Sequence, residues 1–355
     1  MKLRAEDIEP LVIGGALLGG GGGGDAEKGR RFAQVALSLG APELVPLEAL
    51  PPDATVVTVA LVGSPAAVEQ HVEPEDLARS LQLLQEAFGI RVDAINGNEN
   101  GGFASTNGWV QSALLGIPIV DAPCNGRAHP TALMGAIGLH RVPGYLSRQA
   151  AAGGAGPRHL ELTVSGSLEV ASATVRQAAV QAGGVVAVAR NPVDAAYLAS
   201  HGAPGALAMA RRVGEAMLAA MPAGSQAVWS AAAGALGGQV VDVGTVLQVR
   251  LETSGGFDRG TVTVRGARTW EITIWNEYMT LEGDGDREAT FPDLIATLDE
   301  RGMPRTSAEL RQGMTVAILT APQERLLLGA GARDPNLLDA AGAVVGKDLH
   351  RHTVR

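Results

Sequence analysis

The sequence predicts an α/β protein: a mostly parallel sheet with helices on its faces, followed by a C-terminal part built mainly of β-strands. Over the first two thirds of the chain, short apolar strands alternate with helices, which is typical of such a sheet. From about Gly237, β-type runs separated by Gly, Asp and Arg replace that pattern and indicate a small barrel or sandwich. A chain of 355 residues accommodates two domains. We place them at residues 1–235 and 236–355, with a sub-boundary near 150–158.

The elements of the first part follow from apolar spacing and from residues that begin or end helices. A helix is expected from Ala5 to about Leu18, where a run of six glycines ends it. Asp25 is a good N-cap for a second helix at 27–39. A Gly/Ala-rich break is expected at 150–156. Further strands are expected at 54–60, 92–95, 117–120, 160–164 and 185–189, and further helices at 74–88, about 106–115, 168–181 and in two segments ending near residue 221.

The C-terminal part shows the two-residue alternation of strands that have one buried face, for example in 261–264 and 271–274. One short helix is expected near 293–299. No internal repeat is evident. Strands are expected at 240–243, 246–251, 260–264, 270–275 and 316–319.

Composition and charge exclude several classes of function. The formal net charge of −9 and the absence of long basic runs argue against nucleic acid or an anionic membrane surface as a partner. A single cysteine, Cys124, rules out an intrachain disulfide and a cysteine-based zinc site. No secretory or transmembrane segment is evident. We therefore expect a cytoplasmic protein that binds a small-molecule substrate and forms a homo-oligomer.

The six glycines at 19–24 form the first candidate site. Consecutive glycines allow positive φ or a close approach of the backbone to another group, and the helix that follows directs free N–H groups toward its start. The loop matches neither a Rossmann fingerprint nor a P-loop. A flexible or tightly packed helix–helix turn is the alternative, and phosphate or nucleotide binding is a weaker one. The candidate substrate-binding residues here are Gly21, Gly22, Gly23, Gly24 and Asp25.

Polar residues that follow two predicted strands form the second candidate site. Because ligands bind at the carboxyl ends of parallel strands, Glu99 and Asp121 are expected in one crevice, with Arg127 and His129 beside them. A carboxylate pair, a cation and an imidazole could perform acid–base catalysis or hold a metal. Alternatively, Asp121 caps a turn or pairs with Arg127, and His129 is a packed or capping residue. Gly101, Gly102 and Gly126 are further candidate binding residues here.

Two additional features carry chemistry. Cys124 is a candidate nucleophile if the start of a helix near Pro130 lowers its pKa, although a lone cysteine is more often an inert small hydrophobe. Asn276 and Glu277 follow a predicted strand and could contribute to a cleft between the domains, or could simply be turn residues. The spacing of Glu99, Asp121 and His129 matches no established metal motif. We predict no cofactor, and a divalent metal stays open.

In their order along the chain, these motifs resemble the S-methyl thiohydantoin desulfurase family, and the resemblance covers nearly the whole sequence. The residues that carry it are Gly19–Gly24 with Asp25 and Gly29, Glu99 with Gly101 and Gly102, 116–121, 126–128 with Pro130, 253–257, Asn276 with Glu277, 292–295, and Leu310 with Arg311.

The resemblance implies a three-layer α/β domain, a C-terminal β-barrel-like domain and a hydrolytic reaction. In that reaction water displaces methanethiol from a ring carbon of an S-methyl thiohydantoin acid and leaves a hydantoin. Asp121 or Glu99 would act as the base, and a cation such as Arg127 would hold the substrate carboxylate.

This chain departs from the family pattern near the expected pocket. The family commonly has an asparagine and a second acidic residue where this chain has Ala104 and Asn107. It often has an aspartate and a glycine where this chain has Pro123 and Cys124, and a phenylalanine where His129 stands. Two hypotheses therefore remain: a hydrolase of a small cyclic amide or S-methyl thiohydantoin-type acid, and a non-catalytic binding protein that accompanies a hydantoinase- or oxoprolinase-like enzyme.

Overall fold

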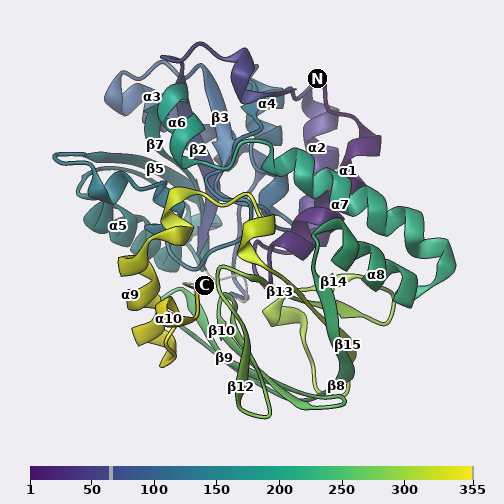
Figure 1. The fold of residues 1–355 in the computed structure, drawn as a ribbon. Coiled ribbons are helices and arrows are strands. Elements are labelled where there is room, and N and C mark those ends of the chain that lie inside the picture. Colours follow the sequence, from purple (N-terminus) through teal and green to yellow (C-terminus); the bar gives the residue numbers. More distant parts are fainter. Residues whose placement is uncertain (64–66, 354–355) are drawn as a thin grey trace.

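The computed structural model describes residues 1–63 and 67–353 and contains two lobes (Figure 1). The first, which we call the α/β lobe, holds a seven-stranded sheet and the helices α1 to α8. Its strands are β1 (Leu44–Val45), β2 (Thr55–Gly63), β3 (Ala94–Gly97), β4 (Ile119–Val120), β5 (Ser147–Gly153), β6 (Leu160–Gly166) and β7 (Val185–Asp194). Its helices are α1 (Ala5–Leu18), α2 (Ala26–Leu39), α3 (Pro74–Phe88), α4 (Trp109–Leu115), α5 (Leu168–Gln181), α6 (Ala195–His201), α7 (Ala206–Ala220) and α8 (Ser225–Ala235).

The strand order of this sheet is β1-β4-β3-β2-β7-β5-β6. The pairs from β1 to β2 are parallel, and β7 runs antiparallel to both β2 and β5. Strand β5 therefore points the same way as β2, while β6 is antiparallel to β5. Most strands of the sheet thus share one direction, as the sequence predicted.

Helices cover both faces of the sheet, so the lobe has three layers. Val57 and Val59 of β2 pack on one face in a core that includes residues of α1 to α4. Ala60 and Val62 of the same strand pack on the other face against α5, for example against Val175. The alternation of side chains along β2 is what presents one set to each layer.

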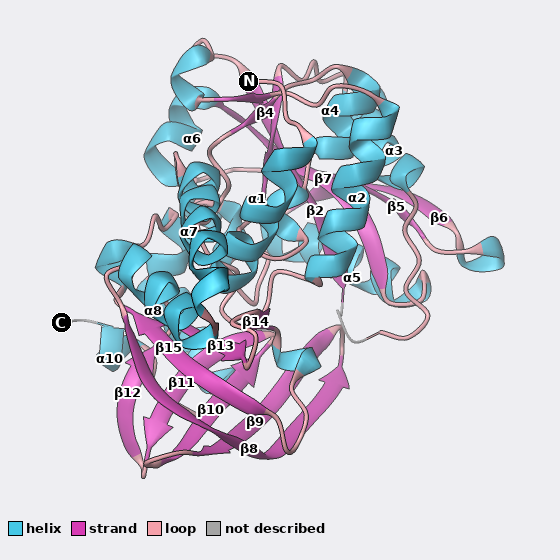
Figure 2. Cartoon of the chain, turned by 90° about the vertical axis from the view of Figure 1, so that its right-hand side faces the viewer, coloured by secondary structure: helices cyan, strands magenta, loops and turns pink. Residues whose placement is uncertain are grey.

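The second lobe, the β lobe, is an antiparallel eight-stranded sheet of order β12-β11-β10-β9-β8-β15-β13-β14. The sheet curls on itself (Figure 2), since the hydroxyl of Tyr278 in β11 lies 3.0 Å from the hydroxyl of Thr297 in β13. The barrel-like C-terminal domain is thereby confirmed. Its strands are β8 (Gln239–Ser254), β9 (Phe257–Arg265), β10 (Thr269–Trp275), β11 (Glu277–Gly283), β12 (Asp286–Thr290), β13 (Leu294–Asp299), β14 (Pro304–Arg305) and β15 (Thr315–Ala321), and the helices α9 (Pro335–Val345) and α10 (His350–Thr353) follow.

The two lobes share a buried apolar core. Leu17 of α1 and Met217 of α7 pack in one cluster with Met279 of β11 and Leu294 of β13. Helices α1 and α7 approach closely because Gly14 faces α7: a Cβ atom at that position would lie 1.8 Å from the carbonyl oxygen of Ala210. This packing holds the end of α1 against the β lobe, which is where the candidate site lies.

Two sequence-based element predictions are wrong. The expected break at 150–156 is largely strand β5, because its small side chains, such as Ala151 and Ala152, are fully buried between helices on the two faces of the sheet. The expected helix near 293–299 is strand β13, which pairs with β15 along its whole length. The N-terminal helices, in contrast, begin and end close to the predicted residues.

Among residues 1–63 and 67–353, no helix combines the length and the apolar character that crossing a membrane requires.

Candidate active site

The glycine loop, residues 19–24, connects α1 to α2 and is bound by both lobes. Its carbonyl groups accept hydrogen bonds from Tyr278 in β11 (Gly20 O, 2.8 Å) and from Ser307 (Gly21 O, 2.8 Å). Gly23 O accepts from the N–H groups of Phe103 and Ala104 in the α/β lobe. The loop therefore fixes the position of the β lobe relative to the residues that follow β3.

Glycine is required in this loop for both conformation and space. Gly21, with φ +92°, and Gly23, with φ +75°, adopt left-handed conformations that other residues avoid. A Cβ atom at Gly22 would lie 2.1 Å from the carboxyl oxygen Oε1 of Glu277, and one at Gly23 would lie 2.4 Å from the Cα of Gly101. The alternative of a tightly packed turn thus accounts for part of the glycine run.

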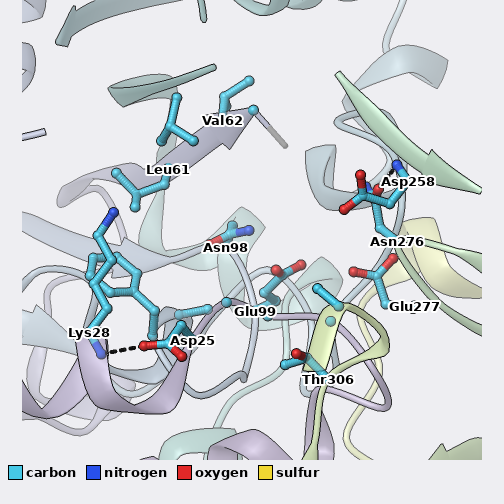
Figure 3. A pocket seen from close by; sticks show the side chains of 18 of the residues that line it. Asp25, Lys28, Leu61, Val62, Asn98, Glu99, Asp258, Asn276, Glu277 and Thr306 are labelled. Atoms are coloured by element: carbon cyan, nitrogen blue, oxygen red, sulfur yellow. Dashed lines mark hydrogen bonds between the residues drawn. The ribbon is translucent and has the colours of Figure 1, made fainter. Parts of the chain in front are cut away.

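A cavity of about 750 Å³ opens beside the loop, between the two lobes (Figure 3). Of the sequence-predicted site residues, those that line it are Gly21, Gly22, Gly23, Gly24, Asp25, Glu99, His129, Asn276 and Glu277. Side chains from α2, β7, α5 and the segment 306–309 complete its wall. The lining thus combines groups that are far apart in the sequence and come from both lobes.

Glu99 and Glu277 are two of the buried carboxyl groups that line this cavity, and their side chains face each other (Figure 3). Glu99 follows β3, and Glu277 is the first residue of β11, directly after Asn276 in a left-handed conformation. Burial raises the pKa of Glu99 to about 8, although the N–H of His129 and the charge of Arg190 act in the opposite direction. Burial and then the charge of Glu99 raise the pKa of Glu277 well above its ordinary value. Because the charge of Glu99 raises the pKa of Glu277, ionisation of Glu99 leaves Glu277 protonated, so the pair holds one carboxylate and one carboxylic acid as the pH approaches 8.

His129 supports Glu99 through its backbone rather than its ring. Its N–H donates a 3.2 Å hydrogen bond to Oε2 of Glu99, while both ring nitrogens lack hydrogen-bond partners among the described residues. Burial, followed by the charge of Arg190, lowers the pKa of His129 to about 3. The imidazole is therefore neutral at physiological pH, and its low basicity makes it a poor general base.

Asp121 does not line the cavity, so the prediction that it shares a crevice with Glu99 is wrong. It follows β4 near the edge of the sheet, and its two carboxyl oxygens accept hydrogen bonds from Leu207 N (2.7 Å) and Ala208 N (3.1 Å). These are first-turn amides of α7, which have no partners within the helix. Asp121 acts as a cap for α7, a different helix from the local turn considered in the sequence.

Arg127 also lies outside the cavity lining, contrary to expectation, and it pairs with carbonyl groups rather than with Asp121. Its guanidinium donates to the carbonyl oxygens of Pro292 and Asp293 and stacks on Phe291, 4.5 Å from the ring centroid. The positive charge of Arg127 interacts electrostatically with the carboxyl groups of Glu99 and Glu277, although Arg127 does not line the cavity. Arg127 therefore contributes to the site electrostatically, and its hydrogen bonds help to hold the two lobes together.

Cys124 and three of the predicted glycines are structural. Cys124 is buried, its Sγ lies 3.2 Å from the Thr58 hydroxyl, and burial raises the pKa of its thiol, which opposes a nucleophilic role. Gly126 packs against the carbonyl group of Leu327, where a Cβ would lie at 2.1 Å. Gly101 and Gly102 pack in the same way against the glycine loop. None of these residues belongs to the cavity lining.

Sequence reasoning missed several cavity residues, above all Arg190 in β7. The available signal was a charged residue directly after the apolar run 185–189. Arg176 of α5 and Lys28 of α2 also line the cavity, and burial lowers the pKa of each. Asn98, which precedes Glu99, accepts a 3.0 Å hydrogen bond from Asn107 and completes the polar floor.

Within the described ranges 1–63 and 67–353, no group of three or more His, Cys, Asp or Glu side chains is arranged to hold a metal ion. The combination of Glu99, Asp121 and His129 considered in the sequence is separated, because Asp121 caps α7 away from the cavity.

Comparison with known families matches almost the whole chain. The model of the S-Me-THD-like N-terminal domain covers residues 6–158, and that of the S-Me-THD-like C-terminal domain covers residues 167–332. The chain belongs to the S-Me-THD-like family. In this S-Me-THD-like protein, Glu99 falls within the first matched segment and both Arg190 and Glu277 fall within the second, so the cavity is built from both.

The fold of this S-Me-THD-like protein is found in a solved structure. The crystal structure of a protein from Chromobacterium violaceum is 21% identical in sequence and covers 98% of this chain and 96% of its own, with a TM-score of 0.74. At this identity the likeness concerns the fold alone. No curated protein matches the sequence.

Proposed function

We propose that this S-Me-THD-like protein is a hydrolase that uses Glu99 and Glu277 as an acid–base pair on a small cyclic amide or S-methyl thiohydantoin-type acid. The observation that carries the proposal is the pair itself: two buried carboxyl groups from different lobes, both with raised pKa values, facing one cavity. Membership of the S-Me-THD-like family is consistent with an enzyme of hydantoin-related chemistry.

The pair is suited to the attack of water on an amidine-like ring carbon. The ionised carboxylate removes a proton from water as the C–O bond forms, and the carboxylic acid protonates the ring nitrogen that receives the C=N electron pair. When the tetrahedral intermediate collapses, its hydroxyl proton returns to the second carboxylate and the first carboxylic acid protonates the departing methanethiolate. Water and the thioether are converted into a ring carbonyl and methanethiol, and both glutamate residues regain their starting protonation states.

The glycine loop offers hydrogen-bond donors to the same substrate. The N–H groups of Gly21, Gly23 and Gly24 have no acceptor among the described residues, and all three residues line the cavity. Amides fixed in this way stabilise a ring oxygen or a developing negative charge without reorganisation.

One observation supports a second candidate, a non-catalytic binding protein that accompanies a hydantoinase- or oxoprolinase-like enzyme. Ala104 and Asn107, which stand where the resembling family commonly has an asparagine and a second acidic residue, both line the cavity. Asn107 is bonded to Asn98 instead of presenting a charge. A cavity that lacks an acidic group at this place could bind a ring without hydrolysing it.

The test is to incubate the protein with S-methyl thiohydantoin acids and cyclic amides and to measure released methanethiol and ring-opened or hydrolysed product. Glu99→Gln and Glu277→Gln should each lower kcat by about a hundredfold or more, while the melting temperature is kept or raised because a neutral amide replaces a buried carboxyl group. Glu252→Gln, an exposed position on β8, is the matched control and should keep wild-type activity. Binding without turnover across the panel would favour the accessory protein instead.

A further inference from the structure

Arg190 is a buried cation without a partner in the part of the chain that the structure describes. Only 4% of its surface is exposed, its Nε has no hydrogen-bond acceptor, and its guanidinium forms no ion pair or side-chain hydrogen bond with any described residue. Its strand, β7, lies between β2 and β5, where Arg190 is paired with Thr58 and Gln149. The neighbouring strands therefore hold its backbone firmly, while its side chain lines the cavity.

The other two guanidinium groups near the cavity, those of the buried Arg127 and the half-buried Arg176, have partners, although Nη2 of Arg127 has no hydrogen-bond acceptor among the described residues. Arg127 donates to the carbonyl groups of Pro292 and Asp293. Arg176 donates a 2.8 Å hydrogen bond to Gly256 O and stacks 4.0 Å from the ring centroid of Phe257. Of these three arginines, Arg190 alone has a guanidinium that makes no hydrogen bond to any residue the structure describes.

The two groups that act electrostatically on Arg190 do not neutralise its positive charge. The acidic group whose charge acts on it most directly in the cavity is Glu99, and burial keeps that carboxyl largely protonated below about pH 8. The Cys124 thiol, the other group that acts on Arg190, is held neutral by burial and is bonded to Thr58. A guanidinium buried without a counter-ion is costly, and a bound anion would remove that cost.

We infer that Arg190 is a specificity-determining residue that binds a carboxylate group on the small molecule entering the cavity. The planar guanidinium matches a carboxylate with two parallel hydrogen bonds, a geometry that lysine cannot reproduce. The inference rests on the proposed function for the ring to which the carboxylate is attached, a five-membered cyclic amide. Arg190 then holds the acidic arm of that molecule while the ring lies between the glycine-loop amides and the two glutamate residues.

The experiment compares two ligands that differ in this charge. Hydantoin-5-acetate and the uncharged 5-methylhydantoin are titrated by calorimetry into the full chain, into Arg190→Met and Arg190→Lys, and into Arg148→Met. Arg148 is the control because it is an exposed arginine on the adjacent strand β5 and lies outside the cavity lining. The melting temperature of each variant is measured in the absence of ligand.

The wild-type protein should bind the acid more tightly than the neutral ring, and Arg190→Met should weaken binding of the acid by roughly tenfold to a hundredfold. Binding of 5-methylhydantoin should not change, Arg190→Lys should be intermediate, and Arg148→Met should match the wild type. The melting temperature of Arg190→Met should be kept or raised, because an unpaired buried charge is removed; an arginine with a purely structural role would give a lower value.

Equal binding of the two ligands by the wild type, no binding of the acid, or full binding of the acid by Arg190→Met would overturn the inference. These outcomes test the anion site independently of the proposed hydrolase activity. Charge-dependent binding through Arg190 without any turnover would reject the hydrolase and keep the anion site. Turnover that does not distinguish charged from neutral rings, and that survives in Arg190→Met, would keep the hydrolase and reject the anion site.

Discussion

Oxygen Oε2 of Glu99 lies 3.2 Å from the backbone nitrogen of His129 and 3.3 Å from its ring nitrogen Nε2. The backbone N–H makes the hydrogen bond, and the ring nitrogen does not. Two groups that would form an ion pair in water are thus buried together, and burial favours the neutral form of each. Folding therefore favours a protonated Glu99 beside a deprotonated His129.

This contact predicts two opposite effects of pH on stability. The pKa of Glu99 is raised from 4.5 to about 8, so its contribution is full below about 4.5 and is lost as pH rises through 8. The pKa of His129 is lowered from 6.5 to about 3, so its contribution is full above 6.5 and is lost as pH falls toward 3. Urea unfolding between pH 5 and 9 measures both, with a maximum slope of about 1.4 kcal/mol per pH unit for each proton.

Variants distinguish the effect of Glu99 on pH-dependent stability from that of His129. Glu99→Gln should flatten the loss of stability between about pH 6.5 and 8, and some slope should remain because the pKa of Glu277 is also raised. His129→Gln should act only below about pH 6.5, where it removes the slope that opposes that of Glu99, so its stability should fall with rising pH already from pH 5. Glu252→Gln, exposed on β8, serves as the control. If the curves of wild type and Glu99→Gln coincide throughout, the buried-carboxyl assignment of Glu99 is wrong.

Asp121 should matter for stability and not for catalysis. Asp121→Ala removes the acceptor for two first-turn amides of α7, so the free energy of unfolding should fall by about 1–2 kcal/mol. Asp121→Asn keeps one acceptor oxygen and should cost less. Activity per folded molecule should equal that of the wild type in both variants. Normal stability combined with lost turnover would instead return Asp121 to the reacting centre.

Gly22 tests the spacing between the glycine loop and Glu277. A methyl group at this position would meet Oε1 of Glu277 at 2.1 Å, so Gly22→Ala must displace that carboxyl group or the loop. We expect a loss of ligand binding or turnover and a lower melting temperature. Gly234→Ala in α8 has open space around its Cβ and should be neutral or stabilising by up to about 1 kcal/mol. Equal behaviour of the two variants would show that the loop tolerates a side chain.

Cys124 should be unreactive in the folded protein. Its side chain is 1% exposed, burial raises its pKa, and Thr58 contacts its sulfur. A colourimetric thiol reagent at pH 8 should therefore detect no thiol in native protein and one thiol per chain in urea, and Cys124→Ala should retain activity. Rapid labelling of the native protein, prevented by a bound ligand, would contradict this assignment.

The helices of the α/β lobe were predictable because their ends are encoded locally. Asp25 accepts a hydrogen bond from Lys28 N as an N-cap, and Pro74 begins α3 at a position that needs no N–H donor. Strand β5 was not predictable, since alanine and glycine have low strand propensity and its burial depends on helices distant in sequence. Strand β13 resembled a helix because every residue from Leu294 to Asp299 is buried, which hides the two-residue alternation.

Part of the candidate site was predictable because it also depends on local sequence, namely on which residues directly follow strands. Glu99 follows a central strand, and the rule that ligands bind at strand ends placed it correctly in the cavity. The same rule failed for Asp121. Strand β4, which Asp121 follows, lies next to the edge strand β1, and the carboxyl group of Asp121 contacts the start of α7 instead of the cavity. The role of Arg190 depends on which partners it lacks in three dimensions, and no local pattern encodes that absence.

The hydrogen bonds from Tyr278 and Ser307 to the carbonyl groups of Gly20 and Gly21 have a consequence for how such proteins diversify. Main-chain groups, not replaceable side chains, set the separation of Glu99 and Glu277. A descendant that keeps a glycine turn of this length inherits that separation unchanged. In the proposed hydrolase, substitution elsewhere in the cavity wall, as at Ala104 and Asn107, could then change which ring is bound without moving Glu99 and Glu277.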